Sequence, residues 1–400
     1  MLKNLLNTYL SYKLLLLLTS LLFIFAAYYS LTFRSFHDYT LYIKQWKSFL
    51  ETGHPYLRAN GNFNGNSYGP LYILLAYLYN IYTFLPRLIF TIMWFACSLL
   101  IVRLSFENIH INSVQRLFIW LFLFINPFFL SFFIFMGNNE IVVTALVVFG
   151  LYYFSQKNEA YAGVLFSLSV IFKFVPGFII PFLFFRKEGL KWQFAWFFAL
   201  VFIYAYAVSF ALWQFELLEP FRFSALRSPK YLSIFRYFES DYSFIKLLGI
   251  ETDLSWLSFP LMLGSLFLLF FFHLKYQLEP IVASIAVFII CYLFYKANHL
   301  QYHTNILILT AFWYVRDYQK IKAYKININP LWIYAIWMSV NQLLYVYFRF
   351  IHVKFDWLRD NVGLPTTIIA IYALLPLIQY TLRSAKEKTV KKENKMAFSY

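Results

Sequence analysis

The sequence predicts an all-α membrane protein that crosses the bilayer about twelve times. Hydrophobic residues make up 61% of its 400 residues and charged residues only 13%, about half the share found in a soluble domain. Apolar runs of roughly twenty residues recur along the chain, and each is long enough for a helix to cross the hydrocarbon core. No stretch between them is large enough for a separate soluble domain. The composition therefore indicates a polytopic membrane protein.

Charge and cysteine content exclude several other classes. The formal net charge is +16, which basic cytoplasmic loops and a basic tail explain. No basic patch falls in a folded soluble region, so we do not expect nucleic-acid binding. Cys97 and Cys291 both lie inside apolar runs and lack the spacing of metal ligands, so we expect neither a disulfide nor a cysteine metal site.

Twelve apolar segments are assigned as spans. The first follows Lys3 and Lys13 and is too long for the core of a signal peptide, so we interpret it as a retained anchor. An even number of spans places both termini in the cytoplasm. The predicted spans are residues 14–33, 88–104, 117–136, 139–155, 160–172, 174–185, 191–212, 255–274, 280–296, 300–315, 330–349 and 363–382.

Prolines decide how two apolar segments are interpreted. The segment YGPLYILLAYLYNIYTFLP (68–86) is short and bounded by prolines, so we place it on the outer side as a juxtamembrane or re-entrant helix. A single helix over 162–185 would bury Lys173 near the middle of the membrane, which is costly. We therefore expect a break at KFVPG (173–177), with the second half returning across the membrane.

The positions of basic residues support this break. With it, the connections RKEGLK (186–191) and RDYQKIKAYK (316–325) and the tail from Arg383 all lie in the cytoplasm. Without it, the last two would lie outside. Lysine and arginine are enriched in cytoplasmic loops, so the broken arrangement is favoured.

We expect residues 1–382 to form one transmembrane domain, and residues 383–400 to form a basic, disordered cytoplasmic tail that faces lipid. The outer face then holds two large loops, about 34–87 and 213–254. Nearly all polar residues that interrupt apolar sequence fall on this side. The outer end is therefore the expected working end of the protein.

Asp38 is the main candidate for chemistry. It follows the first span closely, and a partly desolvated carboxylate beside the membrane can take a proton. The alternative is that Asp38 only caps a helix starting at Tyr39, because aspartate is a good N-cap residue. That helix would carry Tyr42, Trp46 and Phe49 on one face, as expected of an amphipathic helix lying in the membrane interface.

Two further outer connections carry polar residues that suit a bound sugar or phosphate. Lys173, at the tip of the predicted hairpin, is a lone ammonium that could meet an anion or simply reach towards the interface. Asn138, Asn139 and Glu140 are costly at that depth, although a plain loop is the alternative.

A late outer connection, NHLQYH, contains His299, Gln301 and His303. Two histidines four residues apart could ligate a metal, but no third ligand is visible. We expect hydrogen bonds to a phosphate or sugar, or no role at all.

The second outer loop combines basic residues with aromatic ones. Arg227, Lys230 and Arg236 could hold an anionic headgroup, and interface packing is the alternative. The stretch DYSFIKLLG (241–249) predicts a short amphipathic helix with Asp241 at its start. A site with acids, cations, aromatic rings and apolar grooves suits a reaction on a lipid-phosphate substrate.

With these motifs in order, the sequence resembles the GT-C glycosyltransferases, multi-spanning enzymes that use polyprenyl-phosphate sugars as donors. The resemblance is nearest to the mannosyltransferase-like branch related to the GPI-anchor mannosyltransferases. The motifs that carry it are HDY (37–39), GHPY (53–56), YGPLY (68–72), NPFFLSFFIFMGNNE (126–140), AGVLFSLSVIFKFVP (162–176) and HLQYHTNILIL (299–309). The sequence departs from the family pattern at Gly69, where relatives have a proline, and at Asp38, which lacks a second adjacent acid.

The resemblance implies roles for these residues. Asp38 matches the catalytic base, which would deprotonate an acceptor hydroxyl for an inverting attack on the anomeric carbon of the donor sugar. The residues expected at the donor phosphate are Lys173, His299, Gln301, His303, Arg227 and Lys230. Weaker candidates for binding the acceptor or the sugar are Tyr39, His54, Tyr56, Tyr68, Asn138, Asn139, Glu140 and Asp241.

The resemblance also implies the partners and the location. The donor would be a polyprenyl-phosphate sugar, with mannose the commonest in the family, and the acceptor a glycolipid or glycan. No cofactor or metal is expected, and the active site would face the outer side of a prokaryotic plasma membrane. Two alternatives are a lipid-linked saccharide flippase and an oligosaccharide ligase, the latter centred on Arg349, His352 and Arg359. Transporters usually place polar residues near the midplane in two related halves, whereas here they collect at one end.

Overall fold

A computed structural model of the chain describes residues 2–32, 37–57, 66–249, 253–350 and 356–397. This part of the chain is almost entirely helical, with a single two-stranded ribbon, which confirms the predicted all-α class. The described chain divides into two compact units, and the single transmembrane domain stays a prediction. Unit 1 comprises Met1–Gly177, Trp192–Arg227 and Gln342–Phe350, and unit 2 comprises Phe178–Lys191, Ser228–Asn341 and Ile351–Tyr400.

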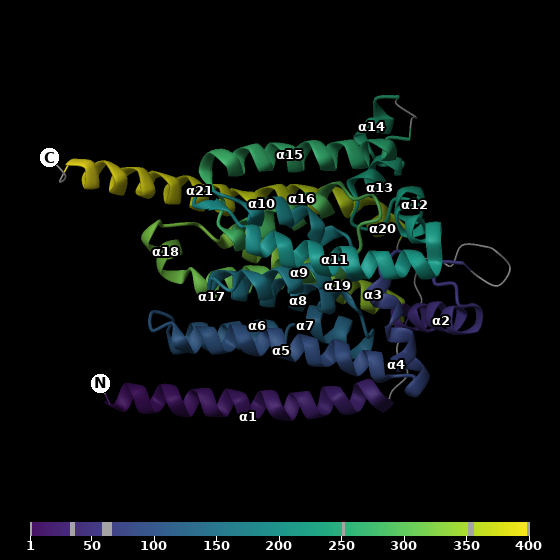
Figure 1. Cartoon of the computed structure of the whole chain (residues 1–400), viewed down its shortest axis with the longest axis horizontal. Coiled ribbons are helices and arrows are strands. Elements are labelled where there is room, and N and C mark those ends of the chain that lie inside the picture. The colour runs from purple at the N-terminus through teal and green to yellow at the C-terminus, as the bar shows by residue number, and fades with distance from the viewer. Residues whose placement is uncertain (1, 33–36, 58–65, 250–252, 351–355, 398–400) are drawn as a thin grey trace. The chain divides into compact units, whose positions relative to one another are not determined.

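Unit 1 is built around helices from the first half of the chain. Its elements are α1 (Leu2–Thr32), α2 (His37–Thr52), α3 (Pro70–Ile73), α4 (Leu75–Ile81), α5 (Leu85–Glu107), α6 (Ser113–Phe124), α7 (Pro127–Phe129), the π-helix η1 (Leu130–Phe135), α8 (Glu140–Ser155), α9 (Glu159–Phe172), α11 (Trp192–Trp213), η3 (Gln214–Leu218) and α12 (Glu219–Leu226). Helix α9 packs against both α8 and α11, and α5 packs against α1, α6 and α8 (Figure 1).

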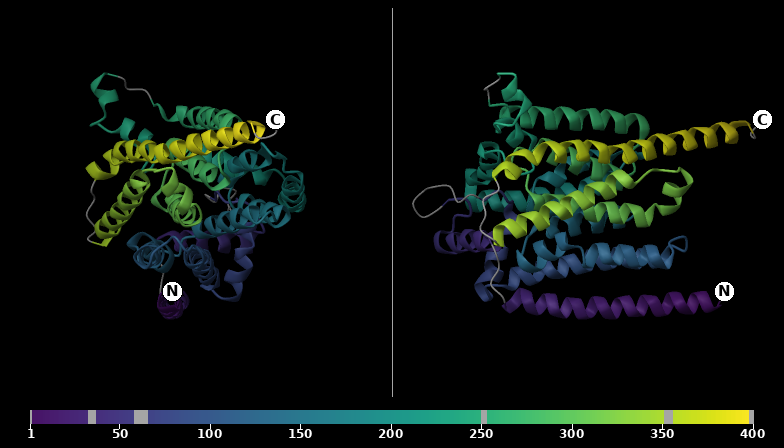
Figure 2. Two further views of the ribbon diagram at one scale, coloured as in Figure 1. Left: turned by 90° about the vertical axis from the view of Figure 1, so that its left-hand side faces the viewer. Right: turned by 180° about the vertical axis from the view of Figure 1, so that it is seen from behind.

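Unit 2 contains most of the remaining helices. Its elements are α10 (Ile180–Phe184), β1 (Phe185–Arg186), β2 (Gly189–Leu190), α13 (Ile234–Glu239), α14 (Phe244–Leu247), η4 (Ser255–Leu257), α15 (Ser258–Tyr276), α16 (Pro280–Phe294), η5 (Leu300–His303), α17 (Thr304–Arg316), α18 (Tyr318–Ala323), α20 (Asp356–Asn361) and α21 (Gly363–Ala397). Helix α16 packs against α15, α17 and α21, and α21 is the yellow helix in Figure 2. Helix α19 (Asn329–Phe350) belongs to unit 2 as far as Asn341.

Every predicted span coincides with an apolar helical segment. Five of the predicted spans fall on shorter elements, namely α8, α9, η2 (Val175–Ile179) with α10, α16, and η5 with α17. The total of twelve crossings stays a prediction. Within the described chain, seven helices are long and apolar enough to cross a membrane, namely Ser11–Thr32, Leu85–Glu107, Ser113–Phe135, Trp192–Leu226, Ser255–Tyr276, Asn329–Phe348 and Trp357–Val390.

The predicted break after α9 is present. Helix α9 ends at Phe172, Lys173 has an extended backbone, and the 3₁₀ helix η2 (Val175–Ile179) follows. Pro176 lacks the backbone N–H that would continue the α-helical ladder, which explains why the helix stops here. The return of the chain across the membrane stays a prediction.

Two other segments differ in detail from expectation. The segment from Pro70 forms two short helices, α3 and α4, that meet at Leu74. The basic tail continues α21 as far as Ala397, whereas the sequence predicts disorder there. Its residues are mostly good helix formers, and neither proline nor glycine occurs after Pro376, so no local signal ends the helix.

Candidate active site

Helix α2 carries Asp38 in its first turn. The helix begins at His37, one residue before Asp38, so the alternative in which Asp38 only caps a helix starting at Tyr39 does not hold. An acid in the first turn is stabilised by the positive end of the helix dipole. The side chain of Asp38 is half-buried.

A cluster of aromatic rings fixes α2 on the body of unit 1. The rings of Trp46 and Tyr72 have centroids 5.5 Å apart, and those of Tyr42 and Tyr68 are 5.9 Å apart. The hydroxyl of Tyr72 donates to Oε1 of Gln45 at 2.8 Å. The apolar face of α2 therefore packs on protein, whereas the sequence predicts an amphipathic helix lying in the membrane interface.

The residues before α8 are buried and make specific hydrogen bonds. Asn138, Asn139 and Glu140 are each at most 1% exposed. Nδ2 of Asn138 donates to Oδ2 of Asp38 at 3.0 Å, and the hydroxyl of Tyr42 donates to Oδ1 of Asn139 at 3.1 Å. Burial raises the pKa of Tyr42 well above its ordinary value, so its hydroxyl keeps its proton and remains a donor. These contacts argue against a plain solvent-exposed loop.

Lys173 forms a buried ion pair with Glu140. The lysine side chain is 10% exposed and that of the glutamate 0%. The ammonium nitrogen of Lys173 also lies 5.7 Å from the centre of the Tyr68 ring. The expectation of a lone ammonium at the end of α9 is therefore corrected, because Glu140 neutralises it.

These contacts join residues that are far apart in the sequence. Asp38, Asn138, Glu140 and Lys173 form one group in unit 1, here called the acid–lysine cluster, which connects α2, α8 and α9. Asn138 lies between the two charged ends, because it contacts Asp38 through its amide and the backbone of Glu140 through its carbonyl oxygen. The sequence predicts that Asp38 and Lys173 lie on the same side of the membrane, and the structure brings them into the same cluster.

Gly69 allows the chain to approach the end of α9. Its backbone N–H donates to the carbonyl of Phe172 at 2.9 Å. A Cβ atom at this position would lie 2.1 Å from the carbonyl oxygen of Ile171, which is closer than any side chain can be. This close approach explains why the chain has glycine where the family pattern has proline.

Arg87 packs beside Gly137, next to the cluster in the sequence, and was not identified from the sequence. It is 0% exposed in the first turn of α5 and donates to the backbone carbonyl of Ile134. Its guanidinium carbon lies 5.3 Å from the centre of the Tyr29 ring. The only sequence signal that could have singled it out is an arginine at the start of an apolar run.

The remaining aromatic and histidine candidates of unit 1 make hydrogen bonds or close contacts within the protein. Tyr39 and Tyr56 are fully buried, and their hydroxyls donate to the backbone carbonyls of Thr83 and Tyr68. They therefore do not offer open faces to a sugar. Nδ1 of His54 lies 2.5 Å from Oε1 of Glu216, a residue that was also not identified from the sequence.

In unit 2, the late outer segment is held by backbone pairing. The N–H of Lys230 donates to the carbonyl of Lys296 at 2.8 Å, while His299 and Gln301 remain half-buried. His303 differs from the expectation of a phosphate ligand, because it is 1% exposed. Its ring nitrogens contact the Tyr334 hydroxyl and Oδ1 of Asn298, so both nitrogens have partners inside the protein.

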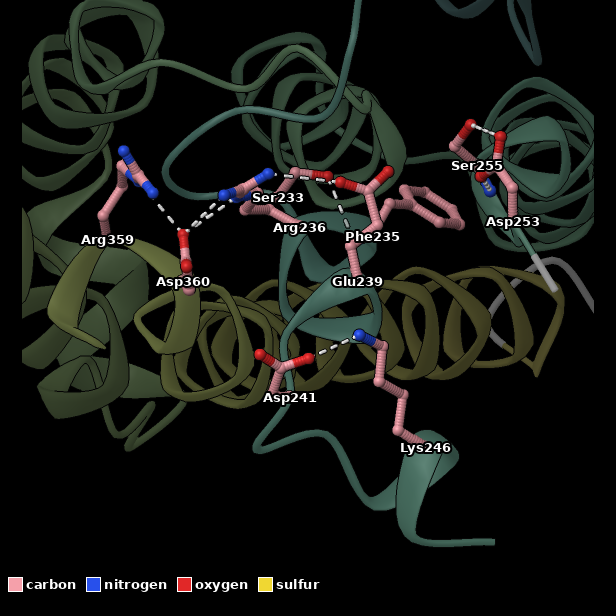
Figure 3. A network of polar contacts seen from close by, with 10 residues as sticks. All are labelled: Ser233, Phe235, Arg236, Glu239, Asp241, Lys246, Asp253, Ser255, Arg359 and Asp360. Atoms are coloured by element: carbon pink, nitrogen blue, oxygen red, sulfur yellow. Dashed lines mark hydrogen bonds and ion pairs between the residues drawn. The ribbon is translucent and has the colours of Figure 1, made fainter. Parts of the chain in front are cut away.

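Figure 3 shows two basic residues of the loop at 213–254, Arg236 and Lys246, paired with acids. Nη2 of Arg236 lies 2.8 Å from Oδ1 of Asp360, and Nε of Arg359 lies 3.0 Å from the same oxygen. Arg236 is therefore part of an ion-pair network rather than an open site for an anionic headgroup. Arg227, at the end of the last segment of unit 1 before Ser228, lies with its guanidinium carbon 5.5 Å from the centre of the Phe223 ring.

Asp241 does not start a helix. The helix α14 is only one turn long and begins at Phe244, with Ser243 as its N-cap. The carboxylate of Asp241 is 91% exposed and lies 2.7 Å from the ammonium of Lys246 (Figure 3). The short helix begins where Ser243 can accept from a backbone N–H, which explains the shifted start.

Within the described residues, no group of three or more histidines, cysteines and acids is close enough to hold a metal ion. The ligase alternative depends on Arg349, His352 and Arg359. The side chains of the first two lie outside the described residues, and Arg359 pairs with Asp360.

The fold and the acid–lysine cluster define a polytopic, all-α membrane protein with a polar site at the ends of its helices. A model of glycosyltransferase family 87 matches residues 66–315, which is more than half of the chain. The chain therefore belongs to this family of GT-C-type membrane glycosyltransferases. Comparisons with curated proteins and with solved structures gave no match.

Family membership makes the protein an enzyme and decides against the flippase alternative. The matched region includes Asn138, Glu140 and Lys173 but begins after Asp38. The role of Asp38 therefore depends on the geometry of the cluster.

Proposed function

We propose that this glycosyltransferase takes a hexose, with mannose as the first candidate, from a polyprenyl-phosphate donor. The acceptor is a lipid-linked or glycan hydroxyl at the outer face of a prokaryotic plasma membrane. The supporting observation is the acid–lysine cluster. In it, Asn138 connects the half-buried carboxylate of Asp38 to the buried ion pair of Glu140 and Lys173. The proposal includes no cofactor and no metal, because the lipid-phosphate sugar is itself the activated substrate.

The proposed reaction is a single displacement. Asp38 takes the proton of the acceptor hydroxyl while the acceptor oxygen attacks the anomeric carbon of the donor sugar. The bond from that carbon to the phosphate oxygen breaks, and polyprenyl phosphate leaves with the electron pair. One displacement at the anomeric carbon inverts its configuration. The position of Asp38 suits this role, since its half-buried carboxylate accepts a hydrogen bond from Asn138.

Charge develops on the leaving phosphate and needs hydrogen-bond donors or cations. Lys173 contributes donors rather than net charge, because Glu140 neutralises it. Lys230, His299 and Gln301, which are half-buried in unit 2, stay sequence-based predictions for the donor phosphate. His303 is withdrawn from this set, because its ring is buried and both nitrogens have protein partners.

The test is sugar transfer by the purified protein from radiolabelled polyprenyl-phosphate mannose, with analysis of the product. Asp38→Asn should abolish transfer while expression and folding are unchanged, because the amide cannot accept the proton. The matched control is Glu51→Gln, which removes an exposed acid from the same helix and should leave turnover unchanged. Normal turnover by Asp38→Asn, or a product with retained configuration, would reject the mechanism.

A further inference from the structure

We infer that Asn138 is a positioning residue that holds the carboxylate of Asp38 in the orientation needed for proton transfer. This inference rests on the proposed role of Asp38 as the base. It is carried by the two hydrogen bonds of the Asn138 side chain and by the way the surrounding backbone is fixed.

The two hydrogen bonds set the orientation of the Asn138 amide. Its Oδ1 accepts from the backbone N–H of Glu140 at 2.9 Å, so this end of the amide must be the oxygen. Its Nδ2 therefore points the other way and donates to Oδ2 of Asp38 at 3.0 Å. A carboxylate only accepts hydrogen bonds, so a donor in this place favours one rotamer of Asp38. Asn138 is 0% exposed, which removes competing water.

The backbone beneath Asn138 is fixed independently of the side chain. Its own N–H donates to the carbonyl of Phe132 at 2.9 Å. Gly137 has a φ of +61°, a backbone conformation that residues other than glycine rarely adopt. A Cβ on Gly137 would also lie 3.1 Å from the side chain of Arg87, which packs directly under the turn. The amide of Asn138 is therefore presented from a rigid support.

Such a support matters because the carboxylate must be placed to within a fraction of an ångström. A displacement of about 1 Å can lower a rate by about 100-fold, even though the substrate still binds. We therefore expect loss of the amide to lower kcat about 10- to 100-fold and to leave the KM values for donor and acceptor within about twofold. A sugar-binding role for Asn138 would raise KM instead.

The experiment compares Asn138→Ala with Asn138→Ser in the radiolabelled transfer assay. Serine can still accept from the N–H of Glu140 and so keeps the local turn, but its hydroxyl is too short to replace the amide at Asp38. Both variants should show the same loss of kcat, and the serine variant should fold normally. Asn112→Ala is the matched control, because it removes a capping asparagine from α6 in the same unit and should leave kcat unchanged.

A double-mutant cycle separates positioning from a general structural effect. In the background of Asp38→Glu, the longer side chain moves the carboxylate away from the amide. There, Asn138→Ser should change kcat by less than twofold. Equal losses in both backgrounds, a change confined to KM, or normal kcat in Asn138→Ser would each overturn the inference. The proposed function fails separately, if Asp38→Asn keeps normal turnover.

Discussion

From the buried ion pair between Lys173 and Glu140 we predict how much the free energy of unfolding falls when either charge is removed. The two side chains are 10% and 0% exposed, so neither charge has water to replace a lost partner. Removing one member of such a pair typically costs about 3 to 5 kcal/mol. We therefore expect Lys173→Met and Glu140→Gln each to lower the free energy of unfolding by about 3 kcal/mol or more.

The double variant should behave differently from either single one. With both charges absent, the interior holds no unpaired ion, and such replacements are often neutral or even stabilising. The double variant should therefore be close to the wild type in stability. Exchanging the charges adds a further comparison, because Glu140 lies in the first turn of α8 and Lys173 follows the last turn of α9. Each exchanged charge would then face an unfavourable helix end, at a cost of about 0.3 to 1 kcal/mol.

The assay is unfolding in detergent micelles by heat or by denaturing detergent, with the four variants measured in parallel. The expected order is the wild type and the double variant at the top, the exchanged pair next, and the two single variants at the bottom. Single variants within about 1 kcal/mol of the wild type would refute the argument, as would a double variant no more stable than the single ones.

The same variants test the role of Lys173 at the donor phosphate. The double variant should recover stability but should need a higher concentration of the lipid donor, because it lacks the ammonium. If its dependence on donor concentration matches that of the wild type, Lys173 has no role at the phosphate.

Two further predictions concern other parts of the chain. Gly69→Ala should lower the free energy of unfolding by several kcal/mol, because the added Cβ would meet the carbonyl of Ile171. The control is Gly264→Ala, whose Cβ would point into open space and should change the free energy of unfolding by no more than about 1 kcal/mol. Both variants are compared in melting experiments. Burial raises the pKa of Asp317, whose carboxylate accepts from the hydroxyl of Tyr380 at 3.0 Å. The pKa of Asp317 is higher in the folded protein than in the unfolded chain, so protonated Asp317 stabilises the fold at low pH. This stabilisation is complete below the unfolded-state pKa and is lost as pH rises through the folded-state pKa. Asp317→Asn should therefore be more stable than the wild type near pH 7, and a gap that does not shrink as the buffer is made acidic would contradict this.

The sequence was most informative about helices and breaks. Apolar runs located the long apolar helices, and the proline after Lys173 located the end of α9. The sequence also singled out Asp38, Lys173 and the GNNE segment, because charged or amide groups at that depth are costly. It could not show that Lys173 and Glu140 pair, since 33 residues separate them along the chain.

The missed residues share one property. Arg87 and Glu216 make their contacts with partners distant in the sequence, namely the carbonyl of Ile134 and the ring of His54. No periodicity or spacing reports such contacts. The same limit explains His303, which has the chemistry of a phosphate ligand but is enclosed by side chains from other segments.

The sequence by itself determined that this chain is an all-α membrane protein. Hydrophobicity and helix breakers act locally, so they can be recognised in a single sequence. Only the tertiary structure decided which polar residues meet, and in particular that Asn138 bridges Asp38 and the backbone of Glu140. Which residues meet in a buried polar cluster depends on how whole helices pack. A local stretch of sequence does not encode that packing.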